Sequence, residues 1–139
     1  MRGWSEMSDQ QDLISDFVNR RVWAVVGASH DPRKFGYQVF RSLRDAGYEV
    51  YPVNHKGGEL DGVKVYRKLA DLPQQPDVVD TVVPPTVTEQ IVKEAHELGL
   101  ARIWMQPGSE SEASVSYCRE HGMQVVERAC AMVWKKRWD

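Results

Sequence analysis

One short stretch constrains the fold more than any other: residues 22–26, VWAVV, are all apolar, and Gly27 follows them directly. A strand inside a parallel sheet is covered on both faces, so its sequence is a continuous apolar run rather than an alternation of apolar and polar residues. The next segment, residues 35–46, spaces its apolar residues as an amphipathic helix does, and Gly47 is a typical helix stop. A buried strand followed by such a helix begins a βαβ unit.

The same alternation continues along the chain. The pattern predicts further strands at residues 49–53, 77–83, 102–105 and 124–126. Two predicted helices, ending at Gly99 and Gly122, separate the last three of these strands. Alternating strands and helices favour a parallel sheet with right-handed crossovers. We therefore predict an α/β fold: a single Rossmann-like domain over residues 1–139, with a five-stranded parallel sheet flanked by helices on both faces.

The stretch from His55 to Pro76 fits this alternation less well. It contains Gly57-Gly58, a candidate short strand at residues 63–66 and one candidate helical turn at residues 69–72. We expect an irregular crossover there.

Three predicted helices begin with residues that favour N-caps. The segments Thr86-Val87-Thr88-Glu89 and Ser109-Glu110-Ser111-Glu112 have the spacing of a capping box, in which a hydroxyl and a carboxylate each satisfy a free amide. Ser8 and Gln11 are candidate caps for an N-terminal amphipathic helix. The inward face of that helix is predicted to hold Leu13, Ile14, Phe17 and Val18. The inward face of the helix after Thr86 is predicted to hold Val87, Ile91, Ala95 and Leu98.

Composition and charge narrow the classes of partner. Hydrophobic residues make up 42% and charged residues 27% of the chain, which suits an ordinary globular core. The net charge of −2 argues against a general nucleic-acid or membrane surface, so any anion site must be a local cluster of basic residues. Two cysteines and the lack of an apolar stretch near the N-terminus favour a reducing compartment, and we expect a cytoplasmic protein.

The loop after the first predicted strand, residues 27–36, is the expected ligand site. In open α/β sheets, ligands bind beyond the carboxyl ends of the strands, at the point where the strand order reverses. The small residues Gly27, Ala28 and Ser29 allow a phosphate to approach the backbone, and the following helix offers free amides and a positive dipole end. Lys34, where that helix begins, adds a full positive charge.

The details of this loop differ from an NAD site. The G-x-G-x-x-G pattern requires glycine at positions 29 and 32, where Ser29 and Pro32 stand. NAD enzymes usually end the second strand with an acidic residue for the ribose hydroxyls, but here Lys56 follows that strand. No P-loop motif occurs either. A lysine suits an additional phosphate, so the residues favour an adenine nucleotide such as coenzyme A (CoA) or NADP.

The sequence resembles the small stand-alone CoA-binding proteins, which are relatives of the nucleotide domain in the succinyl-CoA synthetase alpha subunit. The resemblance covers roughly residues 12–131. The residues that carry it are Val25 to Ser29, Pro32, Lys34, Gly36, Gly47 to Asn54, Asp80, Val82 to Pro84, Ile103 to Gly108, Gly122, Val125, Val126 and Arg128 to Cys130.

The resemblance implies a five-stranded Rossmann-like sheet and a set of ligand-binding positions. Gly27, Ala28 and Ser29 would hold the pyrophosphate, Pro52, Val53 and Asn54 would lie near the adenosine, and Val83 and Pro84 would flank the nucleotide. Together with the loop chemistry, it gives these candidate binding residues: Gly27, Ala28, Ser29, Pro32, Lys34, Gly36, Pro52, Val53, Asn54, Lys56, Val83 and Pro84. The Pro84-Pro85 pair departs from the single proline expected there, and His55 replaces a frequent proline.

Four further residues are candidates for ligand binding with weaker support from the sequence. Arg33 and Arg41 could approach phosphates, although basic residues on helices are usually solvated. Gln106 belongs to the matching block after the fourth strand. Cys130 has two interpretations: a buried structural thiol, or a thiol that forms a mixed disulfide with the pantetheine end of CoA, which requires a thiolate. Cys118, His121 and Cys130 are too few ligands for structural zinc, so we expect no metal.

The synthetase relatives act through a phosphohistidine on a second domain and through a partner subunit, and neither fits in this chain. The resemblance therefore implies binding of CoA or an acyl-CoA without catalysis, in a carrier, sensor or regulatory role. Two alternatives stay open: an NADP-binding oxidoreductase-like protein, and an interaction protein with a vestigial nucleotide site. No protein partner can be named.

Overall fold

The computed structural model describes the backbone of residues 2–138 and the side chains of residues 9–138. The helices are α1 (Arg2–Val18), α2 (Phe35–Asp45), α3 (Pro85–Glu97), α4 (Glu112–Glu120) and α5 (Ala131–Trp134), with a 3₁₀ turn at Leu69–Asp71. The strands are β1 (Val22–Val26), β2 (Glu49–Val53), β3 (Glu59–Leu60), β4 (Val63–Lys64), β5 (Val78–Thr81), β6 (Arg102–Met105) and β7 (Gln124–Val126). No helix among the described residues is long and apolar enough to cross a bilayer.

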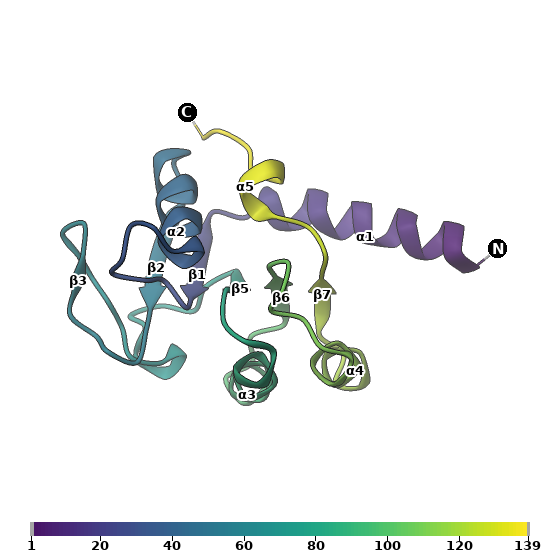
Figure 1. Cartoon of the computed structure of the whole chain (residues 1–139). Coiled ribbons are helices and arrows are strands. Elements are labelled where there is room, and N and C mark those ends of the chain that lie inside the picture. Colours follow the sequence, from purple (N-terminus) through teal and green to yellow (C-terminus); the bar gives the residue numbers. More distant parts are fainter. Residues whose placement is uncertain (1, 139) are drawn as a thin grey trace.

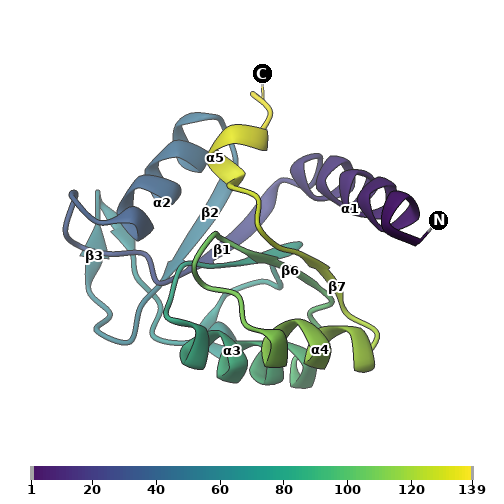
Figure 2. The same ribbon diagram turned by 45° about the vertical axis from the view of Figure 1, so that its right-hand side comes forward.

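The main sheet has five parallel strands in the order β2-β1-β5-β6-β7, which confirms the predicted fold class. Helices α1, α2 and α5 lie on one face of this sheet, and α3 and α4 lie side by side on the other (Figure 1 and Figure 2). Each face therefore has its own apolar core. Trp23 and Trp104 are fully buried on the first face, and Ile103 and Met105 on the second.

The crossover from β2 to β5 is less irregular than predicted. Strands β3 and β4 pair as an antiparallel hairpin, whose turn places Asp61 and Gly62 at positive φ angles of 50° and 78°. Tyr66 continues the chain beside the main sheet through a single bridge to Val53. Leu60 is buried in the core, so the hairpin is anchored to the body of the molecule.

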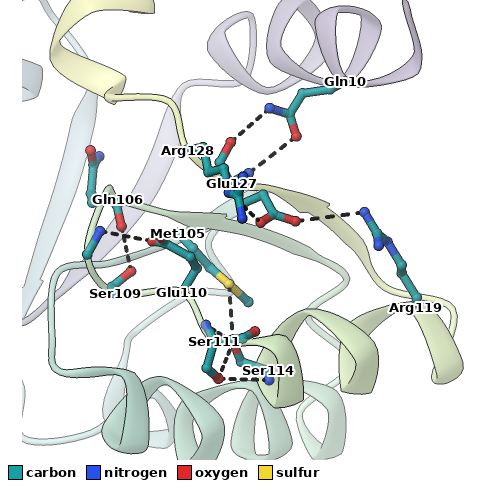
Figure 3. Close-up of polar contacts among 11 residues, drawn as sticks. Gln10, Met105, Gln106, Ser109, Glu110, Ser111, Ser114, Arg119, Glu127 and Arg128 are labelled. Carbon is teal, nitrogen blue, oxygen red and sulfur yellow. Dashed lines mark hydrogen bonds and ion pairs between the residues drawn. The ribbon is translucent and has the colours of Figure 1, made fainter. Parts of the chain in front are cut away.

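The predicted helix starts need correction. Helix α3 begins at Pro85 with Pro84 as N-cap, so no box forms between Thr86 and Glu89; proline is well suited to the first helical position because it has no amide to satisfy. The box predicted at residues 109–112 lies two residues later, where Ser111 and Ser114 cap α4 reciprocally (Figure 3). Helix α1 already runs through position 8, so Ser8 is not its N-cap; the Ser8 side chain lies outside the described residues.

The other residues of these predicted boxes are used elsewhere. Ser109 is buried and its hydroxyl donates to the Gln106 carbonyl oxygen at 2.9 Å (Figure 3). Glu89 accepts a hydrogen bond from the Ser111 hydroxyl, also at 2.9 Å, which joins α3 to the start of α4. In α1, Gln10 exchanges hydrogen bonds with the backbone of Glu127 and so fastens the helix to the chain just after β7 (Figure 3).

Candidate functional site

The strand order reverses direction between β1 and β5. From β1 the chain passes over one face of the sheet to β2, whereas β5 lies on the other side of β1 and continues through α3 on the opposite face. In the strand register Val26 pairs with both Val53 and Thr81, so the three strands end at one edge of the sheet. The loops that follow them diverge there, which is the arrangement that forms a ligand crevice in open α/β sheets.

Two glycines bring these loops into close contact. A Cβ on Gly27 would lie 2.2 Å from the carbonyl oxygen of Val82, and the φ of Gly27 is +100°. A Cβ on Gly36 would lie 2.0 Å from the carbonyl oxygen of Gly27. Neither position has room for a side chain, and Gly27 also has a backbone conformation that other residues rarely adopt. The loop therefore closes on itself and against the end of β5.

Asn54 ties the loop after β2 to the loop after β1. Its Nδ2 donates to the carbonyl oxygen of Ala28 at 2.8 Å, and its Oδ1 accepts from the backbone amide of Lys56 at 2.9 Å. The side chain thus holds the two edges of the crevice at a fixed separation and turns the chain at Lys56.

The loop between Gly27 and α2 is internally braced. The Ser29 hydroxyl accepts from the Asp31 amide at 3.0 Å, and Asp31 pairs with Arg33 at 3.1 Å. The hydrogen bonds from the Arg33 side chain and amide lower the pKa of Asp31. Lys34 is the N-cap residue of α2, and its side chain makes no capping hydrogen bond. The amides of the first turn of α2 therefore have no acceptor among the side chains of residues 9–138.

A cleft of about 540 Å³ occupies the crevice, within the range usual for small-molecule sites. Its apolar wall comes from both faces of the sheet edge and from one side of α3. The lining residues are Val26, Gly27, Ser29, Lys34, Phe35, Gly36, Val53, Asn54, His55, Lys56, Arg67, Lys68, Val82, Val83, Pro84, Val87, Ile91 and Glu94.

Positive charge dominates this cleft. Lys34, Lys56, Arg67 and Lys68 line it, against the single acidic residue Glu94. Among the side chains of residues 9–138, none forms an ion pair with any of these four cations. Four cations without acidic partners, next to the uncapped start of α2, make a site suited to a ligand with several phosphates.

The structure brings together most of the residues predicted from the sequence. Those lining the cleft are Gly27, Ser29, Lys34, Gly36, Val53, Asn54, Lys56, Val83 and Pro84. Ala28, Pro32 and Pro52 do not line it; Ala28 and Pro52 are buried beside it.

The two candidate arginines lie elsewhere. Arg33 forms an ion pair with Asp31, its side chain is 90% exposed, and it is not among the residues that line the cleft. Arg41 pairs with Asp45 at 3.1 Å and with Asp61 at 3.0 Å, and it therefore holds the β3–β4 turn against α2 rather than facing the cleft.

Sequence reasoning missed part of the wall. Arg67 and Lys68 come from the stretch that was expected to be irregular, and only their adjacent positive charges pointed to them. The predicted inward face of α3 is confirmed at Ala95, which is buried, and Ile91 and Leu98 pack against the core while only partly buried. Val87 lines the cleft, and so does one side of Ile91. Nothing in the sequence pattern singled out Glu94.

A second hollow of about 290 Å³ adjoins the cleft. It shares Phe35, Val82, Val83 and Pro84 with the cleft and continues over residues 106–109. Gln106 lies at its border but is fully buried: its Nε2 donates to both carboxyl oxygens of Asp80, at 3.0 and 2.9 Å, and its Oε1 accepts from the Ala131 amide at 3.3 Å. Gln106 therefore positions this loop against α5.

Asp80, which accepts the hydrogen bonds from Gln106, is a buried acid. It lies in the middle of the sheet, on β5, and is fully buried. Burial raises its pKa well above the usual value, and the hydrogen bond from Gln106 opposes this shift only partly.

The two cysteines differ in environment. Cys118 is fully buried, and burial raises the pKa of its thiol to about 12. Cys130 is half-buried at the N-cap of α5 and is not among the residues that line the cleft. Among the described residues, no group of three or more His, Cys, Asp or Glu side chains is arranged to hold a metal ion.

A groove of about 610 Å³ lies between α1, α4 and β7. The charged residues among its described lining are Asp9, Asp12 and Arg119, which together carry a net negative charge and do not suit an anion. The cleft at the ends of β1, β2 and β5 therefore suits an anion better than this groove does.

Two proteins of similar sequence indicate the family of this chain. The chain is 33% identical over 129 residues to the alpha subunit of the ADP-forming acetate–CoA ligase II of Pyrococcus furiosus; the match covers 85% of this chain and 28% of that subunit. It is 30% identical over 110 residues to YneT, an uncharacterized protein of Bacillus subtilis, with 79% and 82% of the two chains covered.

A solved structure of a similar protein has the same fold. A conserved hypothetical protein from Pyrococcus furiosus superposes with a TM-score of 0.79 at 42% identity, over 81% of this chain and 97% of that one. The family model described as the CoA binding domain matches residues 21–136. The matched segment runs from β1 to the C-terminal side of α5 and contains the whole cleft, so the chain belongs to the CoA binding domain family.

Proposed function

We propose that this chain binds CoA or an acyl-CoA in the cleft at the ends of β1, β2 and β5, and that it does so without catalysis. The observation that carries the proposal is the set of four cations without acidic partners that lines this cleft beside the uncapped start of α2. Membership in the CoA binding domain family supports the same ligand. Residues 12–131 form the core of the proposed binding domain.

The pyrophosphate of CoA would lie on the loop from Gly27 to Ser29, against the first turn of α2. Free amides and the positive end of the helix dipole stabilise anions at such a position. The Lys34 ammonium adds a charge-assisted hydrogen bond, which is stronger than a hydrogen bond between neutral groups.

The cations on the opposite wall suit the additional ribose phosphate of CoA. Lys56 follows β2, where NAD enzymes usually carry an acid for the ribose hydroxyls, and Arg67 and Lys68 lie beside it in the cleft. These cations would equally suit the additional phosphate of NADP, which keeps NADP as the second candidate ligand.

The pantetheine arm would extend from the cleft into the adjoining hollow. The two spaces share Phe35, Val83 and Pro84, an apolar border that fits an alkyl amide chain better than a charged nicotinamide ring. In a carrier, sensor or regulatory role, the thiol or acyl end would then lie near residues 106–109.

The proposal is tested by calorimetric titration of the ligand-free protein with CoA, acetyl-CoA, NADP and NAD in one buffer. We expect saturable binding of CoA and little heat from NAD. Binding of NADP without binding of CoA would make NADP the proposed ligand. If none of the four ligands binds, the alternative of an interaction protein with a vestigial nucleotide site is favoured. Incubation with acetyl-CoA, followed by assay of free thiol, tests the non-catalytic part: steady release of CoA would contradict it.

A further inference from the structure

Among the described residues that line the cleft, Glu94 is the one acidic side chain, and the other charged side chains are cations. It lies on α3, on the same helix face as Val87 and Ile91, which also line the cleft. Its Oε1 is buried, and no group among the side chains of residues 9–138 donates a hydrogen bond to it. A buried carboxylate oxygen without a donor is costly, because its lost contacts with water are not replaced.

This acid should also weaken the binding of a ligand with several phosphates. Like charges that share a partly enclosed cleft repel each other. An acid at this position is therefore unfavourable for the free protein and for the electrostatics of phosphate binding. A hydrogen-bond donor on the ligand would offset both costs, because an ionised carboxylate only accepts hydrogen bonds.

The position of Glu94 indicates which part of the ligand carries that donor. Helix α3 begins at Pro85, at the sheet edge that holds the phosphate loop, and runs along the opposite face of the sheet (Figure 1). Glu94 is seven residues beyond Val87, which is roughly 10 Å along the helix axis. A nucleotide with its phosphates on the loop reaches this depth with its base, and the apolar side chains of Val53 and Ile91 line the path.

We propose that Glu94 selects the base by accepting a hydrogen bond from the exocyclic amine of adenine. This inference rests on the proposed function, since it assumes a nucleotide whose phosphates lie on the loop after β1. The amine is the donor on the adenine ring, and the phosphates offer none. Glu94 is thus a specificity-determining residue. Its negative charge weakens the binding of any ligand with several phosphates, and its hydrogen bond to the amine offsets this loss only when the base carries that amine.

The test compares two ligands on each protein: CoA, and a CoA analogue in which purine without the amine replaces adenine. Titrations are made with the wild-type chain, Glu94→Met, Glu94→Gln and Glu97→Met. Glu97 lies on the same helix, is exposed and does not line the cleft, so it is the matched control for loss of the charge. The ratio of the two dissociation constants on one protein does not depend on the folded fraction of that variant.

We expect the wild-type chain and Glu97→Met to prefer CoA about tenfold or more. Glu94→Met should bind the two ligands within about twofold and should bind the purine analogue more tightly than the wild type does, because the repulsion is removed. Glu94→Gln, which keeps an acceptor, should retain part of the preference.

Three outcomes would overturn the inference. If the wild type binds CoA but shows no preference, or if Glu94→Met keeps the preference, Glu94 does not read the amine and the proposed function stands. If a ribose hydroxyl donates to Glu94 instead of the amine, the wild type should show no preference, because CoA and the purine analogue both carry that hydroxyl. Absence of CoA binding by the wild type would overturn the proposed function and this inference together.

Discussion

Gly36, in the first turn of α2, lies directly against the peptide carbonyl of Gly27, so that a Cβ on Gly36 would come within 2.0 Å of that oxygen. This contact sets the distance between the end of β1 and the start of α2. Because the loop between them is the proposed phosphate site, the same contact determines how closely a phosphate can approach the free amides of the helix.

The first prediction is that Gly36→Ala destabilises the fold and weakens ligand binding together. The added methyl group must push α2 away from Gly27, and overpacking of this kind costs about 1–3 kcal/mol of unfolding free energy. The same movement opens the loop, so the dissociation constant for CoA should rise. Urea unfolding and calorimetric titration measure the two effects.

Gly99→Ala is the matched control for this change. Gly99 has a φ of +76°, but no atom lies within 4 Å of the position that an alanine methyl would take, so the substitution adds backbone strain of about 1 kcal/mol without a steric clash. It should lower stability and leave CoA affinity unchanged. Normal CoA affinity in Gly36→Ala would mean that the Gly27 contact does not shape the phosphate site.

The second prediction concerns charge reversal at Lys34. Lys34→Glu should weaken CoA binding by about 100-fold, because it removes a charge-assisted hydrogen bond and adds repulsion. Stability should change by less than about 0.5 kcal/mol, since the side chain is exposed and makes no ion pair with any described side chain. Calorimetric titration measures the affinity.

Lys93→Glu makes the same charge change on α3, at an exposed position that does not line the cleft. Its CoA affinity should fall only slightly, and the difference should shrink as salt is added. If Lys34→Glu binds CoA as tightly as Lys93→Glu does, the phosphate role of Lys34 is wrong.

The positions of most strands could be predicted because short-range pattern decides them, whereas their order in the sheet comes from the structure. The bounds of β1, β2, β6 and β7 agree with the sequence prediction. Strand β1 is wholly apolar, and β2, β6 and β7 each begin with one polar residue before a short, mostly apolar run. The small residues Gly27, Ala28 and Ser29 after β1 likewise identified the loop that lies at the strand-order reversal.

What the sequence could not reveal depends on side chains from distant segments. Arg41 forms ion pairs with Asp45 and Asp61 and therefore does not face the cleft. Asp61 lies next to α2 because the β3–β4 hairpin brings it there, and this long-range contact is not visible in the sequence. The periodicity of α3 identified its apolar face, but it could not show that the cleft borders this face at Val87 and Ile91. The predicted and observed N-caps are Thr86 and Pro84 for α3, and Ser109 and Ser111 for α4. Each pair lies only two residues apart, a difference that the sequence pattern does not resolve.

The third prediction concerns Asn54, which bonds both Ala28 and Lys56. Asn54→Ala loses both hydrogen bonds, and Asn54→Asp loses the donor to Ala28 but keeps the acceptor for the Lys56 amide. Each variant should be less stable than the wild type by about 1–3 kcal/mol, as usual when a partly buried group loses its partner. Urea unfolding measures this loss.

CoA affinity should separate the two Asn54 variants. Asn54→Asp places a negative charge in the cleft beside the phosphates, so it should bind CoA more weakly than Asn54→Ala does, although it keeps one more hydrogen bond. Equal affinity in both variants would indicate that Asn54 acts only on stability and that the phosphates lie away from it.

The last prediction follows from the buried acid on β5. The pKa of Asp80 in the folded chain is raised above its ordinary value of 3.8 by burial, so the folded state holds a proton more tightly than the unfolded state does. The stability that this group contributes is therefore complete below about pH 4 and is lost as the pH rises through the raised pKa. The amide introduced by Asp80→Asn resembles the protonated acid, accepts the same hydrogen bond from Gln106 and does not titrate.

Asp80→Asn should therefore match the wild type near pH 4 and become more stable than it as the pH rises, by about 1–3 kcal/mol once the wild-type carboxyl is ionised. Urea unfolding at several pH values between about 4 and about 9 measures this difference. Asp12→Asn, at an exposed position on α1, should show a difference that stays nearly constant over the same range. A difference for Asp80→Asn that shrinks with rising pH would mean that the buried carboxyl is held ionised, and the donor that stabilises it would then have to be more than the Gln106 amide.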